Sequence, residues 1–250
     1  MKSILGSIWK WIVGCATVAS LIGLVLAFVS DKNAVIIALI AFCISLAIIV
    51  LGVCITVSRL LRQNNPDPYQ RISSFYEFRC DDGQKSVFEM YRLIQSKRAL
   101  LTQIEYKFKW TGTKEPTISS NSQELGPIIS SHDENTWDKC DIHFKTPLTY
   151  NESTVVHIKT ENDDYDGKAQ PFLSSKLDSP IKIMQFKVLL SYKPDGYTVK
   201  AKYERKKIDV DVDAEWEYIA SVDFDSKYKQ YQYVDVNPEP GFIYRLKWEK

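Results

Sequence analysis

The chain lacks the short signatures of the common catalytic and metal sites. Its 250 residues contain no glycine-rich phosphate loop, no G-x-S-x-G motif and no H-E-x-x-H motif. Cys140 and His143 lie three residues apart on an expected strand, so their side chains would point to opposite faces. Residues 162–167 match the first half of a calcium loop, but its twelfth position is Leu173 and not glutamate. We therefore expect no enzyme, no cofactor and no bound metal.

The part of the chain after residue 62 has few cysteines and no excess of positive charge. Of the five cysteines, only Cys80 and Cys140 lie there, whereas a secreted domain of this size is more often stapled by several disulfides. The whole chain has 32 basic and 31 acidic residues, which are interleaved in this part. A nucleic-acid-binding protein would show a basic stripe or patch, so we expect no DNA or RNA partner.

Charged residues are also missing from two long apolar runs near the N-terminus, residues 11–29 and 34–57. Each run reaches the roughly 20 residues that a helix needs to cross a bilayer. A cleaved signal peptide is the alternative for the first run, but the run is too long and leads straight into the second. Only a short polar turn separates the two. We predict a transmembrane helical hairpin over residues 1–62, with helices at about 9–30 and 34–58, and then a proline-rich linker over residues 63–71.

Basic residues flank the predicted hairpin and predict its orientation. Lys2 and Lys10 precede the first run, and Arg59 and Arg62 follow the second. By the positive-inside rule, both termini face the cytoplasm. We therefore expect a two-span protein of the cell inner membrane, with the lipid bilayer as a partner. Because neither run contains a charged residue, we do not expect a selective channel or transporter.

Small side chains recur every four residues along the first run, at Cys15, Ala19, Gly23 and Ala27. Small faces let membrane helices approach closely. Two interpretations stay open: the stripe packs against a similar stripe of the second run within one chain, or it is an interface between copies. These four residues are our candidates for transmembrane packing or oligomerisation, and the second interpretation predicts a homo-oligomer.

Beyond residue 72, apolar and polar residues alternate as in strands with one buried face. No long stretch has the 3.6-residue period of a helix. We predict an all-β domain over residues 72–250, an antiparallel sandwich or barrel. Residues 111–138 are expected to form a long loop, which leaves open a division into two small β modules. The clearest strands are 104–110, 186–192, 197–203, 216–222 and 242–248, and weaker ones are 73–80, 87–95, 141–145 and 154–160.

One basic cluster in this domain has the chemistry of a ligand site. Arg92, Lys97 and Arg98 lie at an expected strand–turn–strand junction, which leads into the strand that ends at Trp110. Basic groups beside an aromatic ring can hold a nucleotide through charge-assisted hydrogen bonds and stacking. The alternative is a solvated basic turn, or one that touches anionic lipid headgroups. These four residues are our candidate ligand-binding residues.

Two membrane spans followed at once by a compact β-rich domain form a known arrangement. In this the chain resembles the two-transmembrane, β-strand-rich effectors of bacterial cyclic-oligonucleotide anti-phage (CBASS) systems. The resemblance covers the whole chain as architecture and rests on no aligned residue motif. It implies a cytoplasmic β domain that binds a cyclic nucleotide, assembly of the protein, and disruption of the inner membrane as antiviral defence. The alternative is a membrane-anchored β-sandwich that serves as adaptor or scaffold for a cytoplasmic protein.

Overall fold

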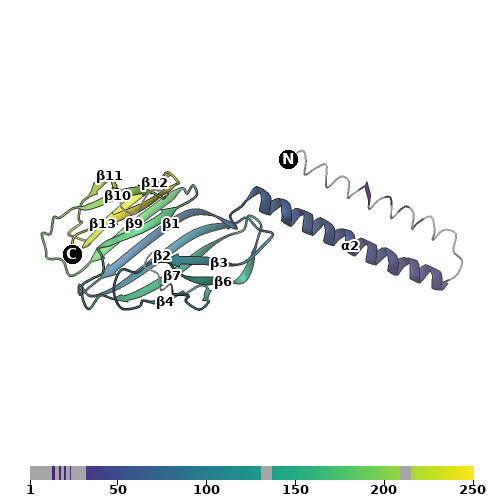
Figure 1. The fold of residues 1–250 in the computed structure, drawn as a ribbon, viewed down its shortest axis with the longest axis horizontal. Coiled ribbons are helices and arrows are strands. Elements are labelled where there is room, and N and C mark those ends of the chain that lie inside the picture. The colour runs from purple at the N-terminus through teal and green to yellow at the C-terminus, as the bar shows by residue number, and fades with distance from the viewer. Residues whose placement is uncertain are drawn as a thin grey trace. The chain divides into compact units, whose positions relative to one another are not determined.

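The computed structural model describes residues 13, 14, 17, 20, 23, 32–130, 137–208 and 215–250. The chain divides into two compact units, Met1–Asp67 and Pro68–Lys250. Figure 1 shows the helix of the first unit and the strands of the second.

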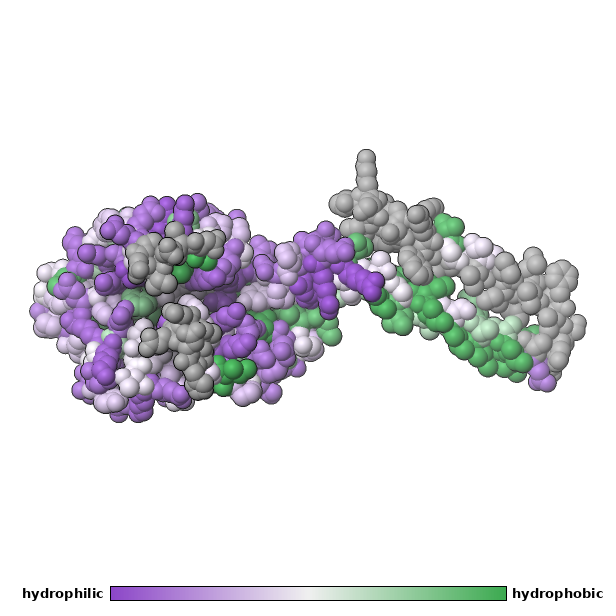
Figure 2. Space-filling model, in the orientation of Figure 1, coloured by the Kyte–Doolittle hydropathy of each residue, from purple (hydrophilic) through white to green (hydrophobic). Residues whose placement is uncertain are grey.

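The first unit contains a helix that is long and apolar enough to cross a membrane. This helix, α2, runs from Lys32 to Asn64, and its stretch Val35–Asn64 has the length and composition of a span. Apolar side chains cover its surface (Figure 2). A helix suits hydrocarbon because it satisfies its own backbone hydrogen bonds. The hydroxyl groups of Ser45 and Thr56 are also satisfied within the helix, since each donates a hydrogen bond to the carbonyl four residues earlier at 2.8 Å.

The second helix of the expected hairpin is not seen among the described residues. Only residues 13, 14, 17, 20 and 23 of the first apolar run are described. Cys15, Ala19 and Ala27 of the small-residue stripe therefore lie outside the described part of the chain. Gly23 lies inside it, and no described heavy atom lies within 4 Å of the position that a Cβ would take there. Because α2 continues to Asn64, beyond the predicted end, only Asn65–Pro68 separates it from the first strand.

The second unit is built from thirteen described strands in three sheets (Figure 1). The strands are β1 (Tyr69–Cys80), β2 (Lys85–Ser96), β3 (Leu100–Phe108), β4 (Thr117–Ser119), β5 (Glu124–Leu125), β6 (Asp138–Thr149), β7 (Ser153–Asp163), β8 (Phe172–Leu177), β9 (Ile183–Leu190), β10 (Ala201–Lys207), β11 (Glu217–Val222), β12 (Gln230–Val236) and β13 (Phe242–Lys247). A six-stranded sheet has the order β12-β9-β1-β2-β7-β4. A four-stranded sheet has the order β11-β10-β13-β8, and a three-stranded sheet the order β3-β6-β5.

The predicted strand-rich domain is confirmed, with one correction to its topology. Neighbouring strands are antiparallel except β1 and β9, which run parallel. A parallel pair needs a long crossover, and the chain between Cys80 and Ile183 supplies it. Of the two expected forms, the structure has the sandwich. The two smaller sheets lie on one face of the six-stranded sheet and enclose the core.

All nine predicted strands are present with shifted bounds, and two substantial strands were not predicted. The run at 197–203 was placed too early, because β10 begins only at Ala201. In β8 the buried Ser175 occupies a position where an apolar residue would have marked the strand. In β12 the buried residue is Tyr231, while Val234 and Val236 are exposed, so polarity does not follow burial.

Strands from both sides of the predicted loop at residues 111–138 share sheets. β2, which precedes it, pairs with β7, which follows it, and β3 pairs with β6 in the same way. The loop itself contributes the short strands β4 and β5, which pair with β7 and β6. The β-rich unit is therefore continuous across this segment.

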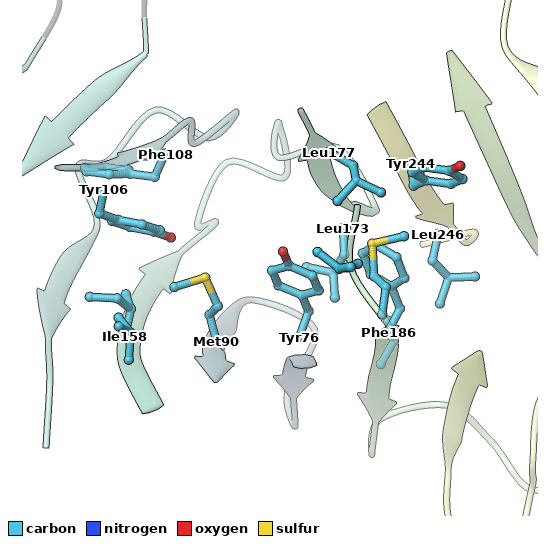
Figure 3. Close-up of a cluster of buried hydrophobic side chains, with 14 of the residues drawn as sticks. Tyr76, Met90, Tyr106, Phe108, Ile158, Leu173, Leu177, Phe186, Tyr244 and Leu246 are labelled. Carbon is cyan, nitrogen blue, oxygen red and sulfur yellow. The ribbon is translucent and has the colours of Figure 1, made fainter. Parts of the chain in front are cut away.

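The buried core residues form one cluster, in which Figure 3 shows two groups of side chains, one under each small sheet. Tyr106 and Phe108 of β3 lie over Met90 and Ile158 of the six-stranded sheet. Leu177 and Leu246 of the four-stranded sheet lie over Phe186, and Tyr76 of β1 stands between the two groups. Tyr76 of β1 and Met90 of β2 thus lie in the middle of the core, between the side chains of the two small sheets.

Candidate functional site

A β-bulge in β1 brings unusual polar residues to the covered face of the six-stranded sheet. The register between β1 and β2 shifts between Arg71 and Ser73, so that Ile72 is an extra residue. In a regular strand, Arg71 and Ser74 would point to opposite faces, but one extra residue turns both to the same side. Arg71 is 9% exposed and Ser74 1% exposed. Arg92 of β2 lies directly opposite Ser74.

Arg71 is buried with only weak compensation for its charge. Its Nη1 donates to the carbonyl of Lys176 on β8 at 2.8 Å. Its Nη2 lies 3.8 Å from a carboxylate oxygen of Asp178, whose side chain is 58% exposed and also pairs with the Lys176 ammonium at 3.2 Å. Burial, together with repulsion from Arg92, lowers the pKa of Arg71. Among the described residues, the carboxylate that pairs with Arg71 is therefore exposed and shared with Lys176.

Arg92 makes no ion pair with any described residue. Its Nε is buried without a hydrogen-bond partner, although part of its side chain reaches solvent. Burial acts to lower the pKa of Arg92, but the phenols of Tyr76 and Tyr69 outweigh burial and the pKa is raised. The Ser74 hydroxyl beside it is also buried without a partner. Two residues opposite each other in the register thus each have a buried polar side-chain atom without a hydrogen-bond partner among the described residues.

Hydroxyl groups from both small sheets surround these arginines. The oxygens of Tyr76 and of Ser175 on β8 lie 2.6 Å apart. Burial acts to raise the pKa of Tyr76, but Arg92, Ser175 and Arg71 outweigh it, so the pKa ends below its ordinary value. Tyr106 on β3 is buried, which raises its pKa. In Figure 3 the hydroxyls of Tyr76 and Tyr106 both lie in the space between the two groups of core side chains.

We call Arg71, Ser74, Tyr76, Arg92 and Ser175 the arginine cluster. It combines one buried cation, Arg71, and one partly exposed cation, Arg92, with three hydroxyl groups. Removing a cation from water costs several kcal/mol unless an opposite charge compensates. Guanidinium groups form short, charge-assisted and often bidentate bonds with carboxylate and phosphate oxygens. The arrangement therefore has the chemistry to hold an anion.

The structure separates the four ligand-binding residues expected from the sequence. Arg92 belongs to the arginine cluster, whereas Lys97 and Arg98 lie in the turn after the end of β2. Lys97 donates there to Gln95 and, at 3.2 Å, to the side-chain oxygen of Asn151. Lys97 and Arg98 are thus in a turn outside the arginine cluster, and the alternatives of a solvated basic turn or a contact with anionic lipid headgroups stay open for them.

Trp110 lies beyond the end of β3, with its indole nitrogen buried and without a partner. Its ring packs so closely on Gly112 that a Cβ there would come within 2.6 Å of it. Sequence reasoning missed Arg71, Ser74, Tyr76 and Ser175. The only signal for Arg71 and Ser74 was the broken alternation at the bulge, which periodicity alone cannot interpret.

The acidic turn at residues 162–167 is structural. Asp164 accepts a hydrogen bond from the backbone of Ala169 at 2.8 Å and pairs with the Lys250 ammonium at 2.7 Å. Gly167 adopts a positive φ of 67°, which closes the turn. Among the described residues no group of three or more histidine, cysteine, aspartate or glutamate side chains could hold a metal ion.

No known protein family and no curated protein matches this chain. Solved structures share a distant likeness in fold. A putative protease from Parabacteroides distasonis is 7% identical with a TM-score of 0.42, and the match covers 72% of this chain and 40% of that protein.

Two further solved structures have the same degree of likeness. An M1 zinc metallopeptidase from Deinococcus radiodurans is 7% identical with a TM-score of 0.39, over 72% of this chain and 42% of that one. Native yeast LTA4 hydrolase is 9% identical with a TM-score of 0.40, and the match covers 73% of this chain and 30% of that protein. This chain spans less than half the length of these three proteins, and likenesses this weak assign it no activity.

Proposed function

We propose that this chain is a membrane-anchored receptor whose β-rich domain binds an anionic signal at the arginine cluster. The observation that carries the proposal is the pair of neighbouring arginines, the buried Arg71 and the partly exposed Arg92. Among the described residues, Arg71 has only an exposed carboxylate that it shares with Lys176, and Arg92 has no ion pair. A bound anion compensates this charge. It also supplies acceptors for Arg92 Nε and the Ser74 hydroxyl.

The ligand class we propose is a cyclic nucleotide. Each phosphodiester carries one negative charge and two free oxygens, so a cyclic dinucleotide offers one phosphate to each arginine. Tyr76 and the partly exposed Tyr69 add hydroxyls and rings beside the same guanidinium groups. Aromatic rings are the usual partners for nucleobases.

The output we propose is at the membrane. Arg71 is the third residue of β1, and Asn65–Pro68 is all that separates β1 from α2. A ligand that restrains Arg71 therefore restrains the segment joined to the membrane helix. In this proposal the chain has two spans with both termini in the cytoplasm. Ligand binding clusters the hairpins, and the clustered hairpins disrupt the inner membrane as an antiviral effector would.

The test uses the full chain in detergent and follows thermal unfolding with a ligand panel. The panel contains inorganic phosphate, adenosine, a cyclic dinucleotide and a cyclic trinucleotide. A ligand at 100 times its Kd stabilises the folded state by about 2.7 kcal/mol, which is a readily measured rise in Tm. We expect a rise with a cyclic nucleotide and none with adenosine, which carries no phosphate.

Two variants locate the site. Arg92→Gln is expected to abolish the rise, and Arg98→Gln, in the turn after β2, to preserve it. The opposite result would place the ligand at the turn. No rise with any phosphate-bearing compound would overturn the receptor proposal and leave the adaptor or scaffold function as the alternative.

A further inference from the structure

The face of the six-stranded sheet that points away from the two small sheets carries an exposed apolar area. We call it the outer face. In a twisted sheet with one covered face, the other face normally carries polar side chains. Here Val236 is 64% exposed, Val155 47%, Val234 45% and Ile183 37%. These residues come from three different strands, so the area crosses the sheet.

The strand registers arrange the outer face in rows that run across five strands, from β12 to β7. One row is apolar apart from a serine, and the next is mostly aromatic and apolar. The third row is charged. The rows are Val236, Ile183, Ser73, Leu93 and Val155; then Val234, Gln185, Phe75, Tyr91 and His157; then Gln232, Lys187, Glu77, Glu89 and Lys159.

We infer that the outer face binds the outer face of a second copy of this chain, about a two-fold axis parallel to β1. About such an axis, β9 of one copy lies opposite β2 of the other, and β12 lies opposite β7. Each row then faces the same row of the second copy. The first row then places Ile183 against Leu93 of the second copy. In the third row Lys187 meets Glu89 of the second copy, and the same pair forms again on the other side of the axis. Glu77 lies on the axis and faces Glu77 of the second copy, and within its own chain it pairs with Lys187 at 3.1 Å.

The alternative face-to-face axis, perpendicular to the strands, fits poorly. An axis through the middle of the three rows lays the apolar row on the charged row. An axis through the charged row instead places Lys187 against Lys187 of the second copy, and burying like charges together costs free energy. The perpendicular axis through the charged row sets all four of its charged residues against their own copies, whereas the axis parallel to β1 does so for Glu77 alone. On this ground we choose the axis parallel to β1.

That axis also suits two chains anchored in one membrane. Rotation about an axis parallel to β1 leaves the starts of both β1 strands, at Tyr69, at the same end of the pair. Each start follows a membrane-length helix after only Asn65–Pro68. The perpendicular axis would send the two starts to opposite ends, where a short connection cannot return both chains to one bilayer.

The size of the face fits a contact between copies. Five strands about 4.8 Å apart and three to four side-chain rows give roughly 500–650 Å² in projection. Interfaces of standard size bury about 800 Å² on each partner. Aligned packing of two sheets face to face is the ordinary geometry of sandwiches. This inference does not depend on the arginine cluster, which lies on the covered face.

The test uses two differently tagged full chains expressed together and extracted in detergent without any nucleotide. The measured quantity is the fraction of one tag that is recovered with the other. Ile183→Asp places a charge in the apolar row. Ile219→Asp is the matched control, because Ile219 on β11 is the same residue type with nearly the same exposure, 38% against 37%, and lies on another sheet.

We expect Ile183→Asp to lower the recovered fraction at least tenfold and Ile219→Asp to leave it unchanged, while both variants keep their thermal unfolding transition. Lys187→Glu and Glu89→Lys are each expected to lower recovery several-fold, and the double variant to restore it. Equal recovery with Ile183→Asp and the unsubstituted chain would overturn the inference, since copies would then be held by other surfaces. Failure of the double variant to restore recovery would overturn the proposed axis.

Discussion

The hydroxyl oxygens of Tyr76 on β1 and Ser175 on β8 lie 2.6 Å apart in the core, joining the six-stranded sheet to the edge of the four-stranded sheet. Tyr76→Phe removes this bond and leaves the Ser175 hydroxyl buried without a partner. We expect the free energy of unfolding to fall by about 1–2 kcal/mol. Because the same hydroxyl faces Arg92, anion binding is expected to weaken as well.

Tyr231→Phe is the control for this prediction. Tyr231 is equally buried, and its hydroxyl donates to the carbonyl of Val199 at 2.7 Å, outside the arginine cluster. Denaturant unfolding should show a similar loss of stability in both variants. Only Tyr76→Phe should raise the Kd for the cyclic nucleotide. An equal effect of both variants on the Kd would show that the Tyr76–Ser175 bond has no specific role in ligand binding.

Replacing Arg92 by glutamine should raise the thermal stability of the ligand-free chain. Most core substitutions destabilise, but this one removes a partly exposed charge whose Nε is buried without a hydrogen-bond partner among the described residues. Sites kept for binding commonly lower stability in this way. Calorimetry of the ligand-free variant checks the sign, and a lower Tm than in the unsubstituted chain would show that Arg92 is compensated in the folded state.

Arg245→Gln provides the contrasting control. Arg245 pairs with Glu204 at 2.8 Å, with side chains 16% and 12% exposed, and its guanidinium lies 3.8 Å from the centre of the Trp216 ring. Removing one partner leaves Glu204 buried and unpaired, which we expect to cost about 3 kcal/mol. The two arginine substitutions should therefore shift Tm in opposite directions.

His157 should make the β-rich unit less stable on mild acidification. Its Nδ1 accepts a hydrogen bond from the backbone of Asn121 at 3.1 Å, its Nε2 is buried without a partner, and its ring lies 4.6 Å from that of Tyr91. Burial lowers the pKa of His157 in the folded state. The unfolded chain therefore takes up a proton first. The stabilising contribution is complete above the ordinary pKa of about 6.5 and is lost as the pH falls from there towards the folded-state value.

His157→Gln removes this titration. The free energy of unfolding of the unsubstituted chain, measured between about pH 7.5 and 5, should fall more steeply below about pH 6.5 than that of the variant. Other groups contribute equally to both chains, so the difference between the two curves isolates His157. Parallel curves would contradict the prediction.

The strands that the sequence predicted best are those in which burial follows polarity. In residues 103–108 of β3 and 184–188 of β9 the inward residues are apolar and the outward ones polar, so period-two alternation is enough to locate these strands. In β12 the outward residues Val234 and Val236 are apolar as well, which erases the alternation. If the outer face packs on a second copy, these valines are buried in the assembly, and the pattern of one chain cannot show it.

Of the five residues in the arginine cluster, the sequence predicted only Arg92. Arg71 became visible through the register shift at Ile72, and a bulge depends on pairing with β2 and not on local sequence. Ser175 reaches the site from β8, about one hundred residues away in the chain. Lys97 and Arg98 are close to Arg92 in sequence. However, β2 ends at Ser96, so Arg92 lies in the strand and the other two residues lie in the turn after it. Proximity in sequence was a poor guide because a strand rises about 3.3 Å per residue.

Gly23→Leu tests whether the first apolar run is a contact between chains. No described heavy atom lies within 4 Å of the Cβ position at Gly23. At a close contact between small-residue faces, however, leucine would separate the helices. In liposomes loaded with a self-quenched dye, a cyclic dinucleotide should release dye through the unsubstituted protein, and Gly23→Leu should reduce the release at least tenfold. Thr17→Leu, two positions from Ala19 and on the opposite side of a helix, is the matched control and should release dye normally. Equal release by both variants would mean that the stripe from Cys15 to Ala27 is not the contact through which the hairpins act.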